Sequence, residues 1–407
     1  MTTAPRRSGH YSPGHAAYPG LDGLRALAVL AVVTTHCAYW TGRYERGWGN
    51  NALTRLDSGV AVFFVLSGFL LVRPWLTAIL QGRSAPSVRV YAVRRVARIM
   101  PAYLAAVVLA MLLLPQNDDA TWADWVRNAF LVQIYRFGWM REGLTQTWSL
   151  STEVAFYVLL PVLGWLILRL GRRRWRPGLL IGTLLLGAVV PLPWYAFLHQ
   201  ATGSLWVSAG YWLPGFMGWF AGGMALAVVR VHLDHATVSQ SSRWWVAEEI
   251  GRHPMTCWAV AAVAFFAAMS PIAGPRSLVA STVAQSFTKQ TLYLVMAIAL
   301  VWPAVFGRSP VTAAVFGNPV MRFAGDISYG VFLYHLIVLD AVMALLDNPL
   351  WTGKVLQVLP LTLAGSVALA AVSFRFLERP AIGRAHQAPR PEPSPETHPR
   401  DLPVATG

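Results

Sequence analysis

The chain has 407 residues, of which 55% are hydrophobic and only 13% are charged. Soluble domains carry about 25% charged residues, so this composition excludes an ordinary soluble protein and predicts a multi-pass membrane protein. The formal net charge of +15 would fit a nucleic-acid-binding protein, but the arginines lie in short runs between apolar segments, where the positive-inside rule puts them. No nucleic-acid motif accompanies this charge, and we expect no nucleic-acid partner.

Ten apolar stretches in the sequence approach the length of about 20 residues that a transmembrane helix needs. In chain order they cover residues 22–41, 59–80, 97–115, 149–170, 178–198, 211–231, 255–272, 290–307, 325–346 and 355–377. We therefore predict an all-α fold, a polytopic membrane helix bundle of about ten transmembrane helices.

The charges of the loops predict how the helices are oriented. The segment after the second stretch contains Arg83, Arg89, Arg94, Arg95 and Arg98, and the segment after the fourth contains Arg172, Arg173, Arg174 and Arg176. The intervening segment, 117–147, contains the acids Asp118, Asp119, Asp124 and Glu142. Because arginine-rich loops stay on the cytoplasmic side, we expect both termini in the cytoplasm and the protein in the plasma membrane.

Three regions follow from this pattern. Residues 1–20 form a polar cytoplasmic segment without the apolar core of a signal peptide. Residues 21–380 form the transmembrane domain in the lipid bilayer, and the proline-rich residues 381–407 are predicted to be a disordered cytoplasmic tail. The aromatic residues of 117–147 predict a short helix lying at the outer membrane surface.

The two cysteines, Cys37 and Cys257, both lie in or beside apolar stretches. Neither has other metal-ligating residues spaced around it. We expect neither a structural disulfide nor a metal site.

The first apolar stretch contains Arg25 and His36. An ionisable group costs at least ~2.5–3.5 kcal/mol at the centre of a membrane helix and is by default a candidate functional residue. Their separation of eleven residues is close to three turns, so both lie on one helix face, roughly 16 Å apart. Histidine suits general-base chemistry near neutral pH. Alternatively, Arg25 extends to the inner membrane surface and His36 is a hydrogen-bonded packing residue.

Two further motifs follow in the chain. Ser67 and Gly68, in the second stretch, either permit tight helix packing through small residues or let a thin substrate chain approach closely. Arg94, Arg95 and Arg98 come next, with Arg94 and Arg98 on one helix face. These arginines either anchor the protein to lipid headgroups or clamp phosphates, which match the planar fork of arginine.

The fourth and ninth stretches also contain ionisable residues. Glu153 is the only acid in the fourth stretch and has no neutralising residue nearby in the sequence. An isolated acid in a membrane helix points to function, and its partner must come from another helix. His335, in the ninth stretch, is either part of the site or a structural hydrogen bond between helices.

These blocks, in this order, resemble the acyltransferase-3 family of integral membrane acyltransferases. The resemblance extends from about Leu21 to Pro380. The first matching element is an arginine and a histidine with ten residues between them, Arg25 and His36. The other matching motifs are Phe-Phe-Val-Leu-Ser-Gly-Phe, Arg-x-x-Arg-Ile-x-Pro-x-Tyr from Arg95, Thr-Trp-Ser-Leu-x-x-Glu, and Ile-Ser-Tyr-Gly with a following histidine.

The resemblance implies transfer of an acyl group, often acetyl, from acyl-coenzyme A to a hydroxyl of a carbohydrate, envelope polymer or secondary metabolite. Acyl-coenzyme A is then a co-substrate, and no bound cofactor or metal is expected. His36 would be the catalytic base and Arg25 its companion. We hypothesise that Glu153 orients His36 and stabilises its imidazolium, as the acid does in a catalytic triad.

The remaining candidates complete this expected site. Those for binding acyl-coenzyme A are Arg94, Arg95, Arg98, Ser67 and Gly68. Those for binding the acceptor or supporting the site are Trp148, Tyr157, Tyr329, Tyr334 and His335.

The alternative is a membrane transporter or flippase for an anionic or sugar-linked substrate, because transporters also use buried arginine, histidine and glutamate. Inverted repeats with matched broken helices would favour it, and the sequence shows none. A non-catalytic scaffold would not need ionisable residues in three separate membrane stretches. The sequence therefore favours an acyltransferase.

Overall fold

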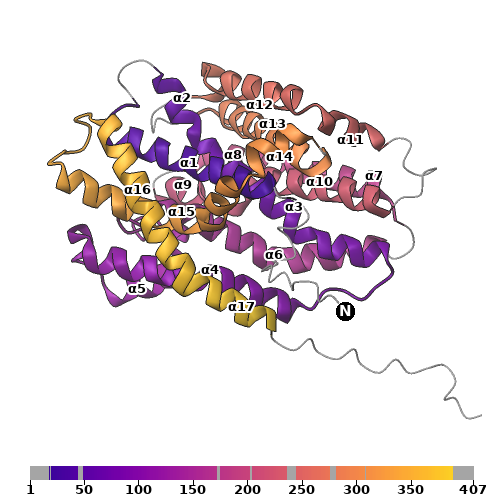
Figure 1. Cartoon of the computed structure of the whole chain (residues 1–407), viewed down its shortest axis with the longest axis horizontal. Coiled ribbons are helices and arrows are strands. Elements are labelled where there is room, and N and C mark those ends of the chain that lie inside the picture. Colours follow the sequence, from indigo (N-terminus) through magenta and orange to yellow (C-terminus); the bar gives the residue numbers. More distant parts are fainter. Residues whose placement is uncertain are drawn as a thin grey trace, which may run out of the picture.

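The computed structural model describes Tyr18 and residues 20–44, 49–171, 175–201, 204–235, 244–275, 281–307 and 309–387. In these ranges every regular element is a helix, and the long helices pack into one bundle (Figure 1). This confirms the predicted all-α bundle. Its orientation across the membrane stays a prediction, and Arg172, Arg173 and Arg174, which helped to predict it, lie outside the described residues.

Nine helical segments of the described chain are long and apolar enough to cross a membrane. They contain α1 (Gly20–Trp40), α3 (Gly59–Leu80), α4 (Val88–Leu113), α6 (Trp148–Gly171), α7 (Pro177–Val189) continued by α8 (Pro191–Gln200), α10 (Met217–His235), α13 (Val283–Phe306), α15 (Pro319–Leu345) and α16 (Val355–Ser373). Each corresponds to one of the predicted stretches.

The predicted stretch 255–272 is the exception. It forms α12 (Pro254–Ala268), an apolar helix of 15 residues that packs on α13. At ~1.5 Å per residue it is about 22 Å long, which is shorter than the hydrocarbon core of about 30 Å. Helix α12 begins at a proline and ends before the turn at Pro271–Ala273. It is therefore shorter than the apolar stretch in the sequence.

Short helices complete the described chain. They are α2 (Asn50–Arg55), α5 (Trp122–Ala129), α9 (Ser204–Ala209), α11 (Trp245–Arg252), α14 (Pro310–Phe316) and α17 (Arg379–Gln387), with 3₁₀ turns at Leu56–Ser58, Pro115–Asn117, Gln133–Tyr135, Thr145–Thr147, Leu213–Phe216 and Pro271–Ala273 and a π-helical turn at Phe374–Glu378. Because α17 continues to Gln387, the disorder predicted from residue 381 is wrong for residues 381–387. The predictions for residues 1–17 and 388–407 lie outside the described residues.

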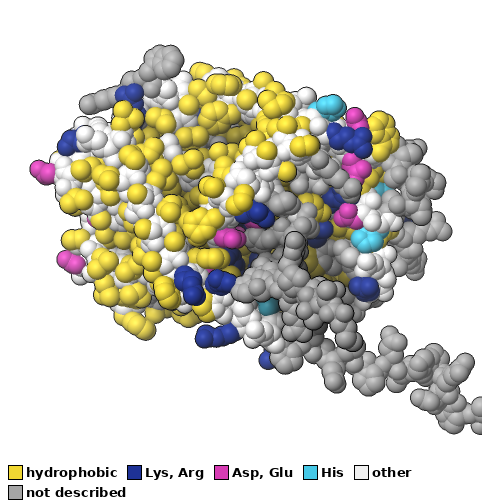
Figure 2. All heavy atoms as spheres, in the orientation of Figure 1, with side chains coloured by type: hydrophobic (Ala, Val, Ile, Leu, Met, Phe, Trp, Pro, Cys, Tyr) yellow, Lys and Arg dark blue, Asp and Glu magenta, His cyan; other side chains and the backbone are white. Residues whose placement is uncertain are grey.

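The outer surface of the bundle is apolar. Leu112 of α4, Val158 of α6 and Leu356 of α16 are 69%, 72% and 88% exposed. Hydrophobic side chains cover most of the face in Figure 2, with few charges between them. An apolar surface of this extent needs a hydrophobic environment, which the lipid of a membrane supplies.

Helices α3 and α10 are in close contact through two glycines. A Cβ atom at Gly223 of α10 would overlap the carbonyl oxygen of Val65, and one at Gly68 of α3 would overlap that of Phe220. Small residues let membrane helices approach until their backbones touch. This contact fixes α3, which supplies one wall of the site described below.

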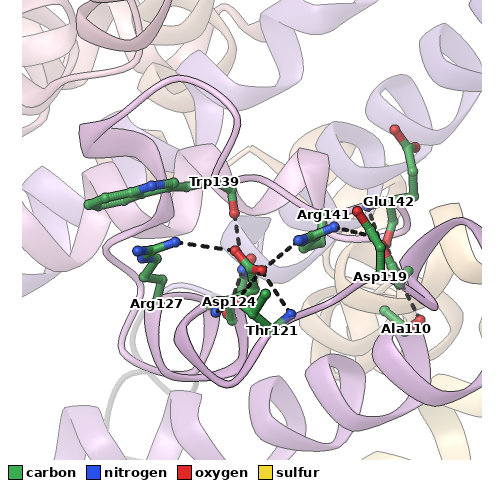
Figure 3. Close-up of polar contacts among 10 residues, drawn as sticks. Ala110, Asp119, Thr121, Asp124, Arg127, Trp139, Arg141 and Glu142 are labelled. Atoms are coloured by element: carbon green, nitrogen blue, oxygen red, sulfur yellow. Dashed lines mark hydrogen bonds and ion pairs between the residues drawn. The ribbon is translucent and has the colours of Figure 1, made fainter.

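The segment between α4 and α6 folds around Asp124, at the first turn of α5 (Figure 3). Its carboxylate accepts a hydrogen bond from Thr121 Oγ1 at 2.7 Å and pairs with Arg141 at 2.5 Å and Arg127 at 3.4 Å. The predicted short helix is thus present, and Trp122 and Phe130 on it and beside it are exposed. Its placement at the outer membrane surface stays a prediction.

We predict that Gly223→Ala destabilises the protein by about 1–3 kcal/mol, because an added methyl group must push α10 away from α3. Thermal unfolding of the purified protein in detergent measures the effect. The control is Gly182→Ala in α7, where a Cβ would meet no atom within 4 Å. Equal stability of the two variants would contradict the tight α3–α10 contact.

A second prediction concerns acid sensitivity. Burial alone would raise the pKa of Asp124, but the hydrogen bonds from Thr121 and Arg141 outweigh it and lower the pKa to about 2. A depressed pKa means that the ionised carboxylate stabilises the fold, by about 2 kcal/mol. This contribution is present above the ordinary aspartate pKa, ~3.9, and is lost as the pH falls toward 2.

Asp124→Asn should therefore lower the free energy of unfolding by about 2 kcal/mol at pH 6 and reduce its dependence on pH below 4. Thermal unfolding between pH 2 and 6 measures both effects. Asp118→Asn, an exposed carboxylate in the same segment, is the control. If the two variants show the same pH dependence, the ion pair does not stabilise the segment.

Candidate active site

A cavity of about 780 Å³ lies between α1, α3, α4, α6 and α15. Cavities of roughly 300–1,000 Å³ are typical of small-molecule sites. The charged residues that line it are Arg25, Arg73, Arg94, Arg95 and Arg98 on helices and Arg83 in the connection between α3 and α4, with Asp22 and Glu153 as the acids. Six arginines and two carboxylates give the lining a strong excess of positive charge, which suits a polyanionic ligand.

Arg25 lies in the cavity wall one turn into α1. Its Nη1 pairs with Oδ1 of Asp22 at 2.7 Å, and the Asp22 side chain is only 3% exposed. Asp22 was missed in the sequence, although its spacing of three residues from Arg25 on one helix was a usable signal. The ion pair compensates part of the charge of Arg25, so this arginine is less available to a bound anion than an unpaired arginine would be.

The arginines of α4 differ in their partners. Arg98 Nη1 lies 3.4 Å from Oε2 of Glu378, and its guanidinium lies 5.8 Å from the ring centre of Tyr329. Arg94 and Arg95 form no ion pair within 4 Å in the described part of the chain, although the charge of Arg95 acts on Glu153. Arg94 Nε is buried without a hydrogen bond there. These two are therefore the cations best placed to receive an anion.

Ser67 and Tyr157 both donate hydrogen bonds to Glu153, the second acid of the cavity wall. Ser67 Oγ and Tyr157 OH share its Oε1, the latter at 2.7 Å. The Ser67 contact joins α3 to α6. In the described residues Glu153 makes no hydrogen bond to His36, and its Oε1 is held by a serine and a tyrosine on the cavity side. The structure therefore does not join these two side chains, and the orientation of His36 by Glu153 stays a hypothesis.

Gly68 does not line the cavity and does not fit the predicted role in binding acyl-coenzyme A. It faces α10, where its missing Cβ makes room for the backbone at Phe220. The alternative interpretation, tight helix packing, is the one that the structure supports. Adjacent residues of α3 thus face different neighbours, Ser67 toward the cavity and Gly68 toward α10.

His36 lies beyond the cavity wall and contacts His335 of α15. His36 Nδ1 is 2.9 Å from His335 Nε2, and the two rings lie edge to edge, with their centres 5.0 Å apart and their planes inclined by 28°. His335 is fully buried, whereas His36 is partly exposed. The pairing was not predicted, although two histidines in apolar stretches that both need polar partners were a signal for it.

Phe332 connects the cavity with this histidine pair. Its ring lines the cavity, 6.5 Å from the ring of Phe63, and lies 6.1 Å from the ring of His335. Its carbonyl oxygen accepts a hydrogen bond from His335 Nδ1 at 2.7 Å. The histidine pair therefore lies one helical turn along α15 from the cavity wall.

The other predicted residues fall into two groups. Tyr329 lines the cavity and donates to the carbonyl oxygen of Ile99 at 2.9 Å. Tyr334 and Trp148 do not line it: Tyr334 donates to Ser373 Oγ at 2.8 Å, and the ring of Trp148 packs on Tyr211. Among the described residues, no group of three or more His, Cys, Asp and Glu side chains could hold a metal ion.

Comparison with known proteins gives a consistent result. The family model of the acyltransferase-3 family, described as an acyltransferase domain, matches residues 18–371. Nodulation protein 10 of Rhizobium leguminosarum bv. viciae is 26% identical over 398 residues, which cover 92% of this chain and 95% of that protein. No solved structure matches the chain.

Two further relatives are longer than this chain. The putative peptidoglycan O-acetyltransferase YrhL of Bacillus subtilis is 25% identical, over 91% of this chain and 56% of its own length. The peptidoglycan O-acetyltransferase OatA of Listeria monocytogenes is 24% identical, over 92% of this chain and 57% of its own length. The chain thus spans a little over half of these relatives. Because the family model covers most of its length, this chain belongs to the acyltransferase-3 family and is a multi-pass membrane protein with an acyltransferase domain.

Proposed function

We propose that this protein is an O-acyltransferase of the plasma membrane. It moves an acyl group, acetyl or another short acyl, from acyl-coenzyme A to a hydroxyl of a carbohydrate, envelope polymer or secondary metabolite. The observation that carries this proposal is the arginine-lined cavity that ends one helical turn from the His36–His335 pair. The family match does not favour the alternative of a transporter or flippase.

The cavity is proposed to bind the donor. Coenzyme A carries several phosphates, and arginine matches phosphate oxygens with its planar fork. Arg94 and Arg95 supply charges that form no ion pair within 4 Å in the described residues, and Arg98 adds a third on the same helix. Under the predicted orientation these arginines lie on the cytoplasmic side, where acyl-coenzyme A is available.

The acyl end of the donor must then reach His36. Arg25 and His36 are roughly 16 Å apart along α1, a separation that suits an extended pantetheine arm. Such an arm would lie along Ser67 and Glu153 and approach Phe63 and Phe332, which form the cavity wall nearest the histidine pair.

His36 is the proposed general base. An unaided hydroxyl is a poor nucleophile toward a thioester, and a neutral imidazole within hydrogen-bond reach accepts its proton during attack. The acceptor oxygen forms a bond to the acyl carbon and the carbon–sulfur bond breaks. The proton held by His36 then passes to the departing thiolate, which leaves as the free thiol of coenzyme A.

We predict that His36→Ala lowers acyl transfer by about 10²–10⁴-fold while the amount of membrane protein stays unchanged. The measurement is release of free coenzyme A from labelled acetyl-coenzyme A by purified protein, with and without a carbohydrate acceptor. His199→Ala, an exposed histidine of α8, is the control. Near-normal transfer by His36→Ala would show that another group is the base.

Removing the unpaired cations should weaken donor binding. Arg95→Ala should raise the Kd for acetyl-coenzyme A about 10–100-fold, which corresponds to the free energy that a hydrogen bond to a charged group contributes. The effect on turnover at saturating donor should be smaller. Calorimetry on the detergent-purified protein measures the Kd. Arg89→Ala is a matched control, because Arg89 is an exposed arginine of the same helix that does not line the cavity. If both variants bind equally well, these arginines are lipid anchors.

A further inference from the structure

The hydrogen bonds of the histidine pair indicate which ring nitrogens carry a proton. A carbonyl oxygen only accepts hydrogen bonds, so the 2.7 Å contact of His335 Nδ1 with the carbonyl of Phe332 requires a proton on that nitrogen. In a neutral imidazole the other nitrogen, Nε2, then has a lone pair and acts as an acceptor.

The same logic extends to His36. Because His335 Nε2 is an acceptor, the 2.9 Å contact requires His36 Nδ1 to be the donor. A neutral His36 therefore carries its proton on Nδ1 and its lone pair on Nε2. This protonation pattern is assigned from the hydrogen-bond partners, starting from the backbone of α15. The backbone of Val32, one turn earlier in α1, is a second hydrogen-bond partner of His36, so the effect of His335 must be measured by substituting it.

Burial distinguishes the two histidines. His335 has no exposed surface, so a hydroxyl acceptor cannot reach it, whereas His36 is partly exposed. Glu153 makes no hydrogen bond to His36 in the described residues, and its Oε1 accepts from Ser67 and Tyr157. The carboxylate whose charge acts on His36 is that of Asp57, and its two oxygens accept hydrogen bonds from Lys289 and Tyr293. His335 is thus the side chain placed to decide which nitrogen of His36 is basic.

We propose that His335 is a positioning residue, which holds His36 in the form with Nδ1 protonated and Nε2 free to accept the proton of the acceptor hydroxyl. The catalytic part of this inference rests on the proposed function. When Nε2 accepts that proton, His36 becomes an imidazolium, and its Nδ1–H bond to His335 becomes a charge-assisted hydrogen bond. His335 thereby does with a neutral ring what a carboxylate does in a serine-protease triad.

A neutral partner also suits the location of the pair. A carboxylate at this depth would add a charge to the membrane domain, where an ionised group is costly. The carbonyl of Phe332 gives His335 its orientation without a further charge, since a helix carbonyl three residues earlier in α15 accepts the bond.

Two substitutions of His335 test the role in catalysis. His335→Leu removes the acceptor and should lower turnover by about 10²–10⁴-fold, the usual contribution of a general base; a triad histidine left in the wrong tautomer loses about 10⁴-fold. Its Kd for acetyl-coenzyme A should not change, because His335 does not line the cavity. His335→Gln keeps an acceptor for His36 Nδ1–H and should restore most of the turnover.

These variants separate positioning from packing. Equal turnover of His335→Leu and the unsubstituted protein would overturn the proposal, as would equal losses in the Leu and Gln variants at equal abundance. A loss of donor affinity in His335→Leu that matches its loss of turnover would also overturn it, because the variant would then have disturbed the cavity.

Nitrogen-15 solid-state NMR of histidine-labelled protein tests the tautomer without any activity. The His36 signals are assigned as those that disappear in His36→Ala. We expect a protonated Nδ1 and an unprotonated Nε2 for His36, and a mixture of tautomers in His335→Leu. A protonated Nε2 in the neutral unsubstituted protein, or the same single tautomer in His335→Leu, would overturn the inference. If His36→Ala stays active while the NMR result holds, the proposed base is wrong and the tautomer assignment still stands.

Discussion

The structure depends on one constraint: a polar or ionisable side chain buried among membrane helices needs a polar partner. Glu153 of α6 is met by Ser67 of α3, and His36 of α1 is met by His335 of α15. Each contact joins helices that are far apart in the sequence. The helices around the cavity are therefore positioned by a few hydrogen bonds as well as by apolar packing, which is non-directional and specifies register less sharply.

Helix α15 brings the two halves of the proposed site together. Tyr329, Phe332 and His335 follow one another at intervals of three residues, close to one helical turn, and so lie along one side of the helix. Tyr329 lies beside Arg98, Phe332 forms cavity wall, and His335 contacts His36. A single rigid element thus connects the proposed phosphate end with the proposed proton-transfer end, and precise placement is easier on a helix than on a loop.

The sequence was sufficient for most of the helices and for the importance of Arg25 and His36, because hydropathy and helical spacing are local properties. It was insufficient for the contact of Glu153 with Ser67, which comes from a helix 86 residues away and has no local signal. The other partner, Tyr157, lies four residues later on the same helix. Gly68 was assigned to ligand binding because a glycine beside a serine is compatible with either a thin substrate or a close helix. Only the position of α10 decides between these roles. The stretch 255–272 was apolar over a greater length than its helix, since hydropathy does not show where a helix ends.

The glycine contact between α3 and α10 has a consequence for the range of donors. The wall formed by α3 cannot retreat, because the backbone of α10 lies directly behind Gly68. The opposite wall is made by α4 and by α17, whose Ile382 and His386 also line the cavity. Helix α17 follows a π-helical turn at Phe374–Glu378, a wider coil than the α-helix on either side of it. Helix α17 packs on α4, the helix that carries the arginines. If the cavity binds the donor as proposed, a change in α17 or in the π-turn before it would therefore alter the space at the phosphate end of the donor, while the α3 wall stays fixed.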